Sequence, residues 1–159
     1  MKRYLTIILM LTALLLAGCG TAGAASDEGS SSHAEEPCAE HDWGVQLTAT
    51  DVTSTGLTIV CTQSGGSPTG ELSTGSYYVV EQYRDDAWVE LDYLIENVGL
   101  TDEACLFTAG GRVEWVTDWE WLYGALSYGE YRIGKEIMDF RATGDYDTCL
   151  HYAYFTISG

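Results

Sequence analysis

The sequence is poor in positive charge. It contains 7 Lys and Arg residues against 24 Asp and Glu residues, which gives a formal net charge of −17 at pH 7. Binding to nucleic acid or to an anionic lipid surface requires cationic side chains that displace counterions. Nucleic acid is therefore excluded as a partner. The acidity is consistent with solubility outside the cell, and binding of a cation or a cationic partner is the alternative.

Catalytic motifs are also absent. The chain has no Gly-x-Ser-x-Gly elbow and no His-Glu-x-x-His pair. Its three histidines, His33, His41 and His151, have no catalytic motif around them. Paired carboxylates are uninformative in so acidic a chain. We therefore predict that the protein is not an enzyme.

The longest apolar run is too short to span a membrane. It extends from Tyr4 to Leu16, follows Lys2 and Arg3, and ends in small residues, whereas a transmembrane helix needs about 20 apolar residues. This is the layout of a secretory signal peptide, predicted here as residues 1–18. Its end, Leu-Leu-Ala-Gly-Cys, resembles the lipobox of bacterial lipoproteins. The resemblance implies that Cys19 carries a diacylglyceryl group and becomes the new N-terminus, which palmitate labelling would detect.

The composition changes after Cys19. Residues 20–36 are mostly small, polar or acidic and include no large apolar side chain, so they cannot offset the entropy of ordering. We predict a disordered linker over residues 19–37 and one domain over residues 38–159. Loss of Lys2 and Arg3 with the signal peptide takes the formal charge from −17 to about −19. The expected location is the outer face of the cell membrane, where the lipid holds the protein.

The domain has the pattern of an all-β protein. Apolar residues alternate with polar ones in short segments separated by turn-forming residues, and no convincing helix is predicted. The pattern predicts a two-sheet antiparallel sandwich, with a barrel as the alternative. The predicted strands are 45–49, 57–61, 76–83, 88–93, 105–108, 112–121, 131–140 and 149–157.

A local motif favours an immunoglobulin-like sandwich. Leu126, Gly129 and Tyr131 have the spacing of a tyrosine corner at the entrance to a penultimate strand. Together with Trp-Gly-Val at 43–45, Thr-Gly-Leu-Thr at 55–58, Gln-Ser-Gly-Gly at 63–66, and Trp-Glu-Trp-Leu-Tyr-Gly at 119–124, the motif resembles a bacterial Ig-like domain common in Firmicutes lipoproteins. The resemblance covers most of residues 43–157. It implies an Ig-like fold at the cell surface, and it brings no catalytic residues and no established ligand.

The other four cysteines suggest disulfides. Cys38, Cys61, Cys105 and Cys149 form an even set in an exported domain, and three connectivities are open. In an Ig-like strand order all four lie at one end of the sandwich. The favoured pairing is Cys61 with Cys149, which leaves Cys38 with Cys105. A zinc site that includes His41 and His151 is the alternative, although the chain has no Cys-x-x-Cys pair.

Two sets of residues are candidates for binding. Asp145 and Asp147 lie in the last hairpin and offer oxygen ligands for Ca²⁺, but two carboxylates alone are too few and both are ordinary turn residues. Trp115 and Trp119 share one strand face with Trp121, and exposed Trp residues mark contact surfaces for glycans or proteins. Trp121 and Tyr123 are expected to fill the core near the corner.

The sequence therefore predicts a membrane-anchored extracellular module that presents a binding or adhesion surface to a protein or glycan. The alternatives are a structural spacer, a Ca²⁺-binding surface domain, and an inhibitor or accessory subunit of a cell-wall enzyme.

Overall fold

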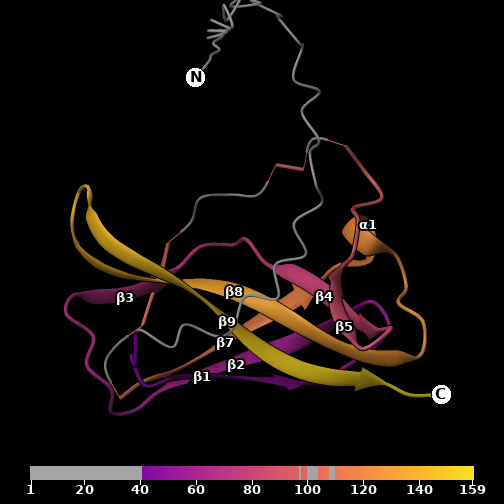
Figure 1. Ribbon diagram of the computed structural model, residues 1–159, viewed down its shortest axis with the longest axis horizontal. Helices are drawn as coiled ribbons and strands as arrows, with labels where there is room; N and C mark the ends of the chain where they lie inside the picture. Colours follow the sequence, from indigo (N-terminus) through magenta and orange to yellow (C-terminus); the bar gives the residue numbers. More distant parts are fainter. Residues whose placement is uncertain (1–40, 97, 100–103, 108–109) are drawn as a thin grey trace, which may run out of the picture. The chain divides into compact units, whose positions relative to one another are not determined.

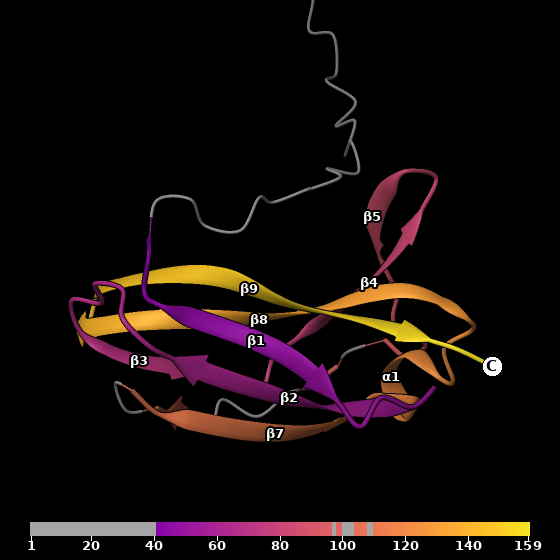
Figure 2. The same ribbon diagram turned by 90° about the horizontal axis from the view of Figure 1, so that it is seen from below.

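The computed structural model describes residues 41–96, 98–99, 104–107 and 110–159. They form two antiparallel sheets, with β2 and β7 on one side and β8 and β9 on the other (Figures 1 and 2). The three-stranded sheet has the order β1 (Val45–Thr50), β2 (Gly56–Gln63), β7 (Arg112–Asp118). The six-stranded sheet has the order β5 (Ala87–Glu90), β4 (Val79–Arg84), β8 (Gly129–Ala142), β3 (Glu71–Thr74), β6 (Cys105–Leu106), and β9 (Asp145–Ile157) pairs with β8. The predicted two-sheet antiparallel sandwich is confirmed.

Alternate residues of β2 and β8 form the core between the sheets. Leu57 and Ile59 of β2, and Ile133 and Ile137 of β8, are buried with at most 3% of their surface exposed. Successive side chains of a strand point to opposite faces, so each of these pairs lies on the inner face of its sheet. The core thus follows from the period-two pattern of the sequence.

The entrance to β8 is fixed by a tyrosine. The Tyr131 side chain is 1% exposed, and its hydroxyl donates to the backbone oxygen of Ser127 at 3.0 Å. Its ring stacks on Phe155 of β9, with 5.5 Å between the centroids. This is the contact of a tyrosine corner, and it joins the loop before β8 to the core.

β3 and β4 lie in succession along the same edge of β8. β4 pairs with residues 131–134 of β8 and β3 pairs with residues 137–140, so the chain forms one interrupted strand beside β8. The interruption spans residues 75–78. Lys135 of β8 faces this gap and its Nζ donates to the backbone oxygens of Gly75 at 2.6 Å and Tyr77 at 3.2 Å. A buried ammonium thus replaces the missing backbone donors.

Several predicted boundaries were wrong. The expected strand at 112–121 ends at Asp118, and a helical turn, α1 (Glu120–Tyr123), follows it although no helix was predicted. The Asp118 carboxylate accepts the Glu120 N–H at 2.9 Å, which starts the turn. β3 lies in a segment for which no strand was predicted, and the last hairpin is longer than predicted because β8 and β9 continue to a tight turn at 143–144.

The favoured disulfide pairing was also wrong. Cys61 and Cys105 carry free thiols, so neither Cys61–Cys149 nor Cys38–Cys105 is formed. Cys149 is disulfide-bonded. Across the six-stranded sheet, Ile137 and Thr74 lie between Cys149 and Cys105. Two strands therefore separate Cys149 from Cys105 within the sheet. Cys105 instead contacts Trp115 on β7 of the other sheet. Cys38 lies outside the described residues.

Candidate functional site

The tryptophans near the end of β7 point in different directions from those predicted. Trp119 is fully buried and its Nε1 donates to the backbone oxygen of Ser54 at 3.0 Å, so a binding role for Trp119 is wrong. Trp121, expected in the core, is 48% exposed. The prediction assumed a continuous strand, whereas the turn at Asp118 rotates Trp121 out of the core. Trp115 lies within β7 and is half-buried.

A cleft of about 560 Å³ brings Trp115 and Trp121 together. It lies where β7, α1, β6, β8 and the interruption between β3 and β4 meet. This volume is within the range of small-molecule sites, which are typically apolar with a few polar groups. The lining includes Tyr78, Cys105, Trp115, Asp118, Trp121 and Lys135.

Trp115 forms a fixed wall of the cleft. Its Nε1 donates to the Cys105 Sγ at 3.3 Å, and its ring meets Phe107 edge-on with 6.4 Å between centroids. The Lys135 Nζ lies 5.4 Å from the ring centroid, within the range of a cation–π contact. These three contacts hold the ring in one orientation before any ligand arrives.

Lys135 is the only lysine after residue 18, and it is buried. Burial lowers the pKa of its ammonium to about 8, an effect that the charge of Cys105 partly opposes. The group is therefore still mainly protonated at neutral pH. Since its Nζ already donates to two backbone oxygens, its role is to hold the cleft wall in place and to supply positive charge nearby.

Tyr78 and Asp118 provide polar groups at the cleft. Burial, with smaller effects from Tyr93 and Asp118, raises the pKa of Tyr78 to about 12, so its hydroxyl remains a neutral hydrogen-bonding group. That hydroxyl donates to the backbone oxygen of Asp118 at 3.4 Å. The cleft thus combines two indole rings, a phenol and a carboxylate, which suits a ligand with both apolar and hydrogen-bonding faces.

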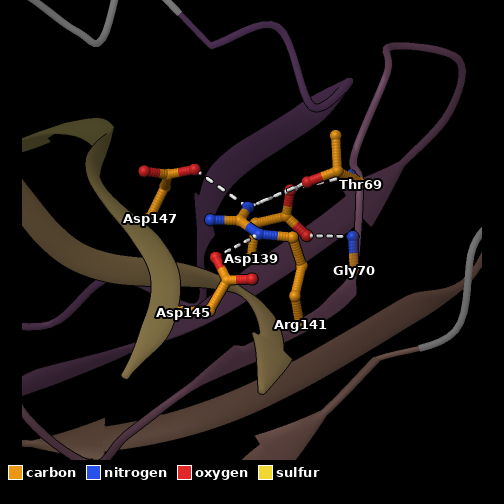
Figure 3. A network of polar contacts seen from close by, with 6 residues as sticks. All are labelled: Thr69, Gly70, Asp139, Arg141, Asp145 and Asp147. Carbon is orange, nitrogen blue, oxygen red and sulfur yellow. Dashed lines mark hydrogen bonds and ion pairs between the residues drawn. The ribbon is translucent and has the colours of Figure 1, made fainter. Parts of the chain in front are cut away.

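The two acidic residues of the last hairpin bind an arginine. Arg141 Nε donates to Asp145 at 2.8 Å, and its Nη1 donates to Asp147 and to the Thr69 hydroxyl, both at 2.9 Å (Figure 3). Both carboxylates are therefore neutralised from within the chain. Among the described residues, no group of three or more His, Cys, Asp or Glu side chains is arranged to hold a metal ion. His41 and His151 instead contact the Trp43 ring.

Asp139 holds the loop before β3 against β8. Its carboxylate accepts hydrogen bonds from Thr69 N at 2.7 Å, Thr69 Oγ1 at 2.9 Å and Gly70 N at 2.6 Å (Figure 3). A Cβ on residue 70 would collide with the backbone oxygen of Phe140, so only glycine allows this approach. Burial alone would raise the pKa of Asp139, but these hydrogen bonds and the Arg141 charge lower it below its ordinary value.

A second aromatic group lies on the outer face of the six-stranded sheet. Trp88 contacts Tyr83 and Tyr154, with centroid distances of 5.1 and 5.5 Å. Arg132 lies over Trp88 and Tyr152 and forms an ion pair with Glu81, so it is 4% exposed. Tyr83 and Tyr154 remain exposed. This group was not predicted from the sequence, although Arg132 on β8 and the alternate residues Tyr152 and Tyr154 on β9 are its signal.

Three predicted segments, the signal peptide at 1–18, the lipidated Cys19 and the linker to residue 37, lie outside the described residues. In the part of the chain that is described, no helix has the length and apolarity needed to cross a bilayer.

The comparisons with known proteins give one match. A family model described as a bacterial Ig-like domain matches residues 40–152. Neither the curated proteins nor the solved structures include a match to the chain.

Proposed function

The chain belongs to the bacterial Ig-like domain family, and we propose that it is a lipid-anchored extracellular module that binds a glycan in the cleft between Trp115 and Trp121. Domains of this family are typically non-catalytic surface modules. The observation that carries the proposal is the half-exposed Trp121, which lines one cleft with a Trp115 ring that is already held by several contacts.

The proposed anchor rests on the sequence. The apolar run from Tyr4 to Leu16 precedes the lipobox-like end at Cys19. Two acyl chains on one cysteine give stable membrane binding, whereas a single chain gives only marginal binding. Residues 20–36, which are small, polar or acidic, then place the domain away from the lipid surface as a flexible linker.

The proposed ligand class follows from the chemistry of the cleft. Indole rings pack against the C–H faces of sugar rings, and they lose little conformational entropy when they do so. Tyr78 and Asp118 supply hydrogen bonds for sugar hydroxyls. The net charge of about −19 after loss of the signal peptide disfavours an acidic polysaccharide. We therefore expect a neutral or amino-sugar glycan.

Calorimetric titration with a neutral oligosaccharide tests the glycan site. The probes are a β-1,4-linked trimer of N-acetylglucosamine and a linear glucose trimer. We expect the wild type to bind one of these trimers. Trp121→Ala should raise the Kd for that trimer by at least about 10-fold, because truncation of a central aromatic contact usually costs more than about 1.4 kcal/mol.

The matched control is Trp88→Ala, which removes an indole from the outer face and leaves the cleft intact. Equal binding by the wild type and Trp121→Ala would overturn the cleft as the site. Binding lost only in Trp88→Ala would move it to the outer face, where Tyr83 and Tyr154 favour a second candidate function, contact with a protein. No binding by any variant would favour a structural spacer.

Metabolic labelling tests the anchor separately. The full chain, expressed in a bacterium supplied with labelled palmitate, is expected to incorporate label and to enter the detergent phase of a phase separation. Cys19→Ala should lose both properties. A soluble, unlabelled wild-type protein would contradict the anchor without affecting the glycan site.

A further inference from the structure

Two free thiols lie on the inner faces of opposite sheets. Cys61 is near the end of β2 and is 1% exposed, in line with the buried Leu57 and Ile59 of the same strand. Cys105 lies in β6 of the other sheet and is half-buried. Since Cys149 is already in a disulfide, these two are the cysteines left without one among the described residues.

The strand register directs Cys105 toward the three-stranded sheet. Cys105 pairs with Thr74 of β3, and Thr74 pairs with Ile137 of β8. Paired residues of neighbouring strands place their side chains on the same face. Thr74 is 3% exposed and Ile137 is fully buried, so this row faces the space between the sheets. Cys105, at the end of the row, faces the same space.

A contact across the sheets supports this direction. The Cys105 Sγ accepts the Trp115 Nε1–H at 3.3 Å, and Trp115 belongs to β7. On β7, Val113 is two residues away, and it pairs with Cys61 on β2. Cys105 therefore reaches the strand that lies directly beside Cys61.

We propose that Cys61 and Cys105 form a disulfide that joins β2 to β6 at the base of the cleft. An exported domain meets oxidising conditions, in which an even set of cysteines is normally paired. The proposal rests on the export part of the proposed function, and it does not depend on the glycan.

The two thiols differ in a way that sets the order of the reaction. Burial, with a smaller effect from the charge of Cys105, raises the pKa of Cys61 to about 11, so the two groups are close enough to interact. Cys105 lines the cleft and is the accessible thiol. Its thiolate attacks an external disulfide, and one thiol of that reagent leaves. The Cys61 sulfur then displaces the second thiol. Overall, one external disulfide is reduced to two thiols as the new S–S bond forms.

The bridge has a consequence for the cleft. β6 is joined to its sheet by only two register pairs, Ser73 with Leu106 and Thr74 with Cys105. A covalent bond from Cys105 to the central strand of the opposite sheet fixes this wall beside Trp115. Oxidation is therefore expected to raise the thermal stability of the domain and to keep the cleft in one shape.

Peptide mapping tests the bridge directly. The full chain is exported from a bacterium, purified without reductant, treated with a maleimide under denaturing conditions and digested. We expect no maleimide on Cys61 or Cys105 and a linked peptide that contains both. Cys61→Ser should expose Cys105 to the maleimide, and Cys105→Ser should expose Cys61. Maleimide on both cysteines of the wild type, or a peptide linking either of them to Cys149, would overturn the proposal.

A second measurement separates the bridge from export. The mass of the N-terminal peptide shows whether the chain was processed at Cys19. The purified chain is also reduced and then oxidised with oxidised glutathione, so that bridge formation is scored without export. We expect the midpoint of thermal unfolding to be about 10 °C higher in oxidised wild type than in oxidised Cys105→Ser. The bridge would be contradicted if the oxidised wild type had the same unfolding midpoint as oxidised Cys105→Ser and lacked the linked peptide. This holds whatever the result for Cys19.

Discussion

At the scale of single residues, the described domain depends on charged groups whose partners are far away in the sequence. Asp139 binds Thr69 and Gly70, about 70 residues earlier, and Arg141 donates to the Thr69 hydroxyl of the same loop. The sequence gives no local sign of these contacts, because an Asp on the inner face of a strand and a Thr-Gly pair in a loop do not indicate each other.

Replacement of Asp139 tests this contact. Asp139→Asn keeps one acceptor oxygen and places an amide N–H near the donors of Thr69 and Gly70, so we expect the free energy of unfolding to fall by about 2–3 kcal/mol at pH 7. Asp145→Asn, at an exposed carboxylate, is the control and should cost less than about 1 kcal/mol. Urea denaturation measures both. Equal effects would contradict the role of Asp139.

The same variant has a defined pH dependence. The pKa of Asp139 is lower in the folded protein than its unfolded value of about 3.9. The folded state therefore binds fewer protons, and the stabilisation is present above this unfolded value and is lost as pH falls toward the folded one. The difference in stability between the wild type and Asp139→Asn should shrink as pH falls below about 4. A difference that is constant from pH 7 to pH 2 would contradict the lowered pKa.

Residues with local signals were the easiest to place from sequence. The spacing of Leu126, Gly129 and Tyr131 was enough to predict the corner, because all of its atoms come from one short segment. Trp119 and Trp121 were placed the wrong way round, since one side chain, the Asp118 carboxylate, converts the strand into a turn. A period-two pattern of apolar residues does not indicate the position at which a side-chain hydrogen bond of this kind ends the strand.

At the scale of elements, the interrupted strand beside β8 is the feature that creates the cleft. β3 was not predicted, and the strand predicted at 76–83 begins inside the interruption, because Tyr77 and Tyr78 fit the pattern of the strand that follows them. The overlooked signal is on β8. Lys135 takes an inner-face position between Ile133 and Ile137, where only a residue with buried acceptors to bind is tolerated.

The pKa of Lys135 can be measured without interference from other lysines. The domain has no other lysine, so the Cε resonance reports this group alone. We expect the resonance to titrate with a midpoint near pH 8, because burial disfavours the ammonium. A midpoint near the unperturbed value of about 10.4 would contradict its burial.

This pKa also predicts the direction of a stability change. Between pH 8 and about 10.4 the folded state binds fewer protons than the unfolded state, so the contribution of Lys135 to stability rises with pH in this window. Relative to Lys135→Met, the wild type should therefore gain stability from pH 8 to pH 10. A difference that stays flat or falls across this window would be inconsistent with the lowered pKa.

At the scale of the whole molecule, fold and function differ in how far the sequence leads. The two-sheet sandwich follows from alternation and turns, which are repeated along the chain and tolerate errors at single positions. The cleft depends on where five separate segments meet, β6, the gap at 75–78, β7, α1 and β8. Trp115 was predicted as a contact residue, but Trp121, Tyr78 and Lys135 join it only through the tertiary fold.

Indole resonances show whether the cleft between Trp115 and Trp121 binds a glycan. The five tryptophans, Trp43, Trp88, Trp115, Trp119 and Trp121, each give one indole N–H signal, and two-dimensional ¹H–¹⁵N spectra follow them all during titration with the N-acetylglucosamine trimer or the glucose trimer. We expect the signals of Trp115 and Trp121 to shift together while those of Trp43, Trp88 and Trp119 stay in place. Shifts confined to Trp88, or no shift at saturating glycan, would contradict it.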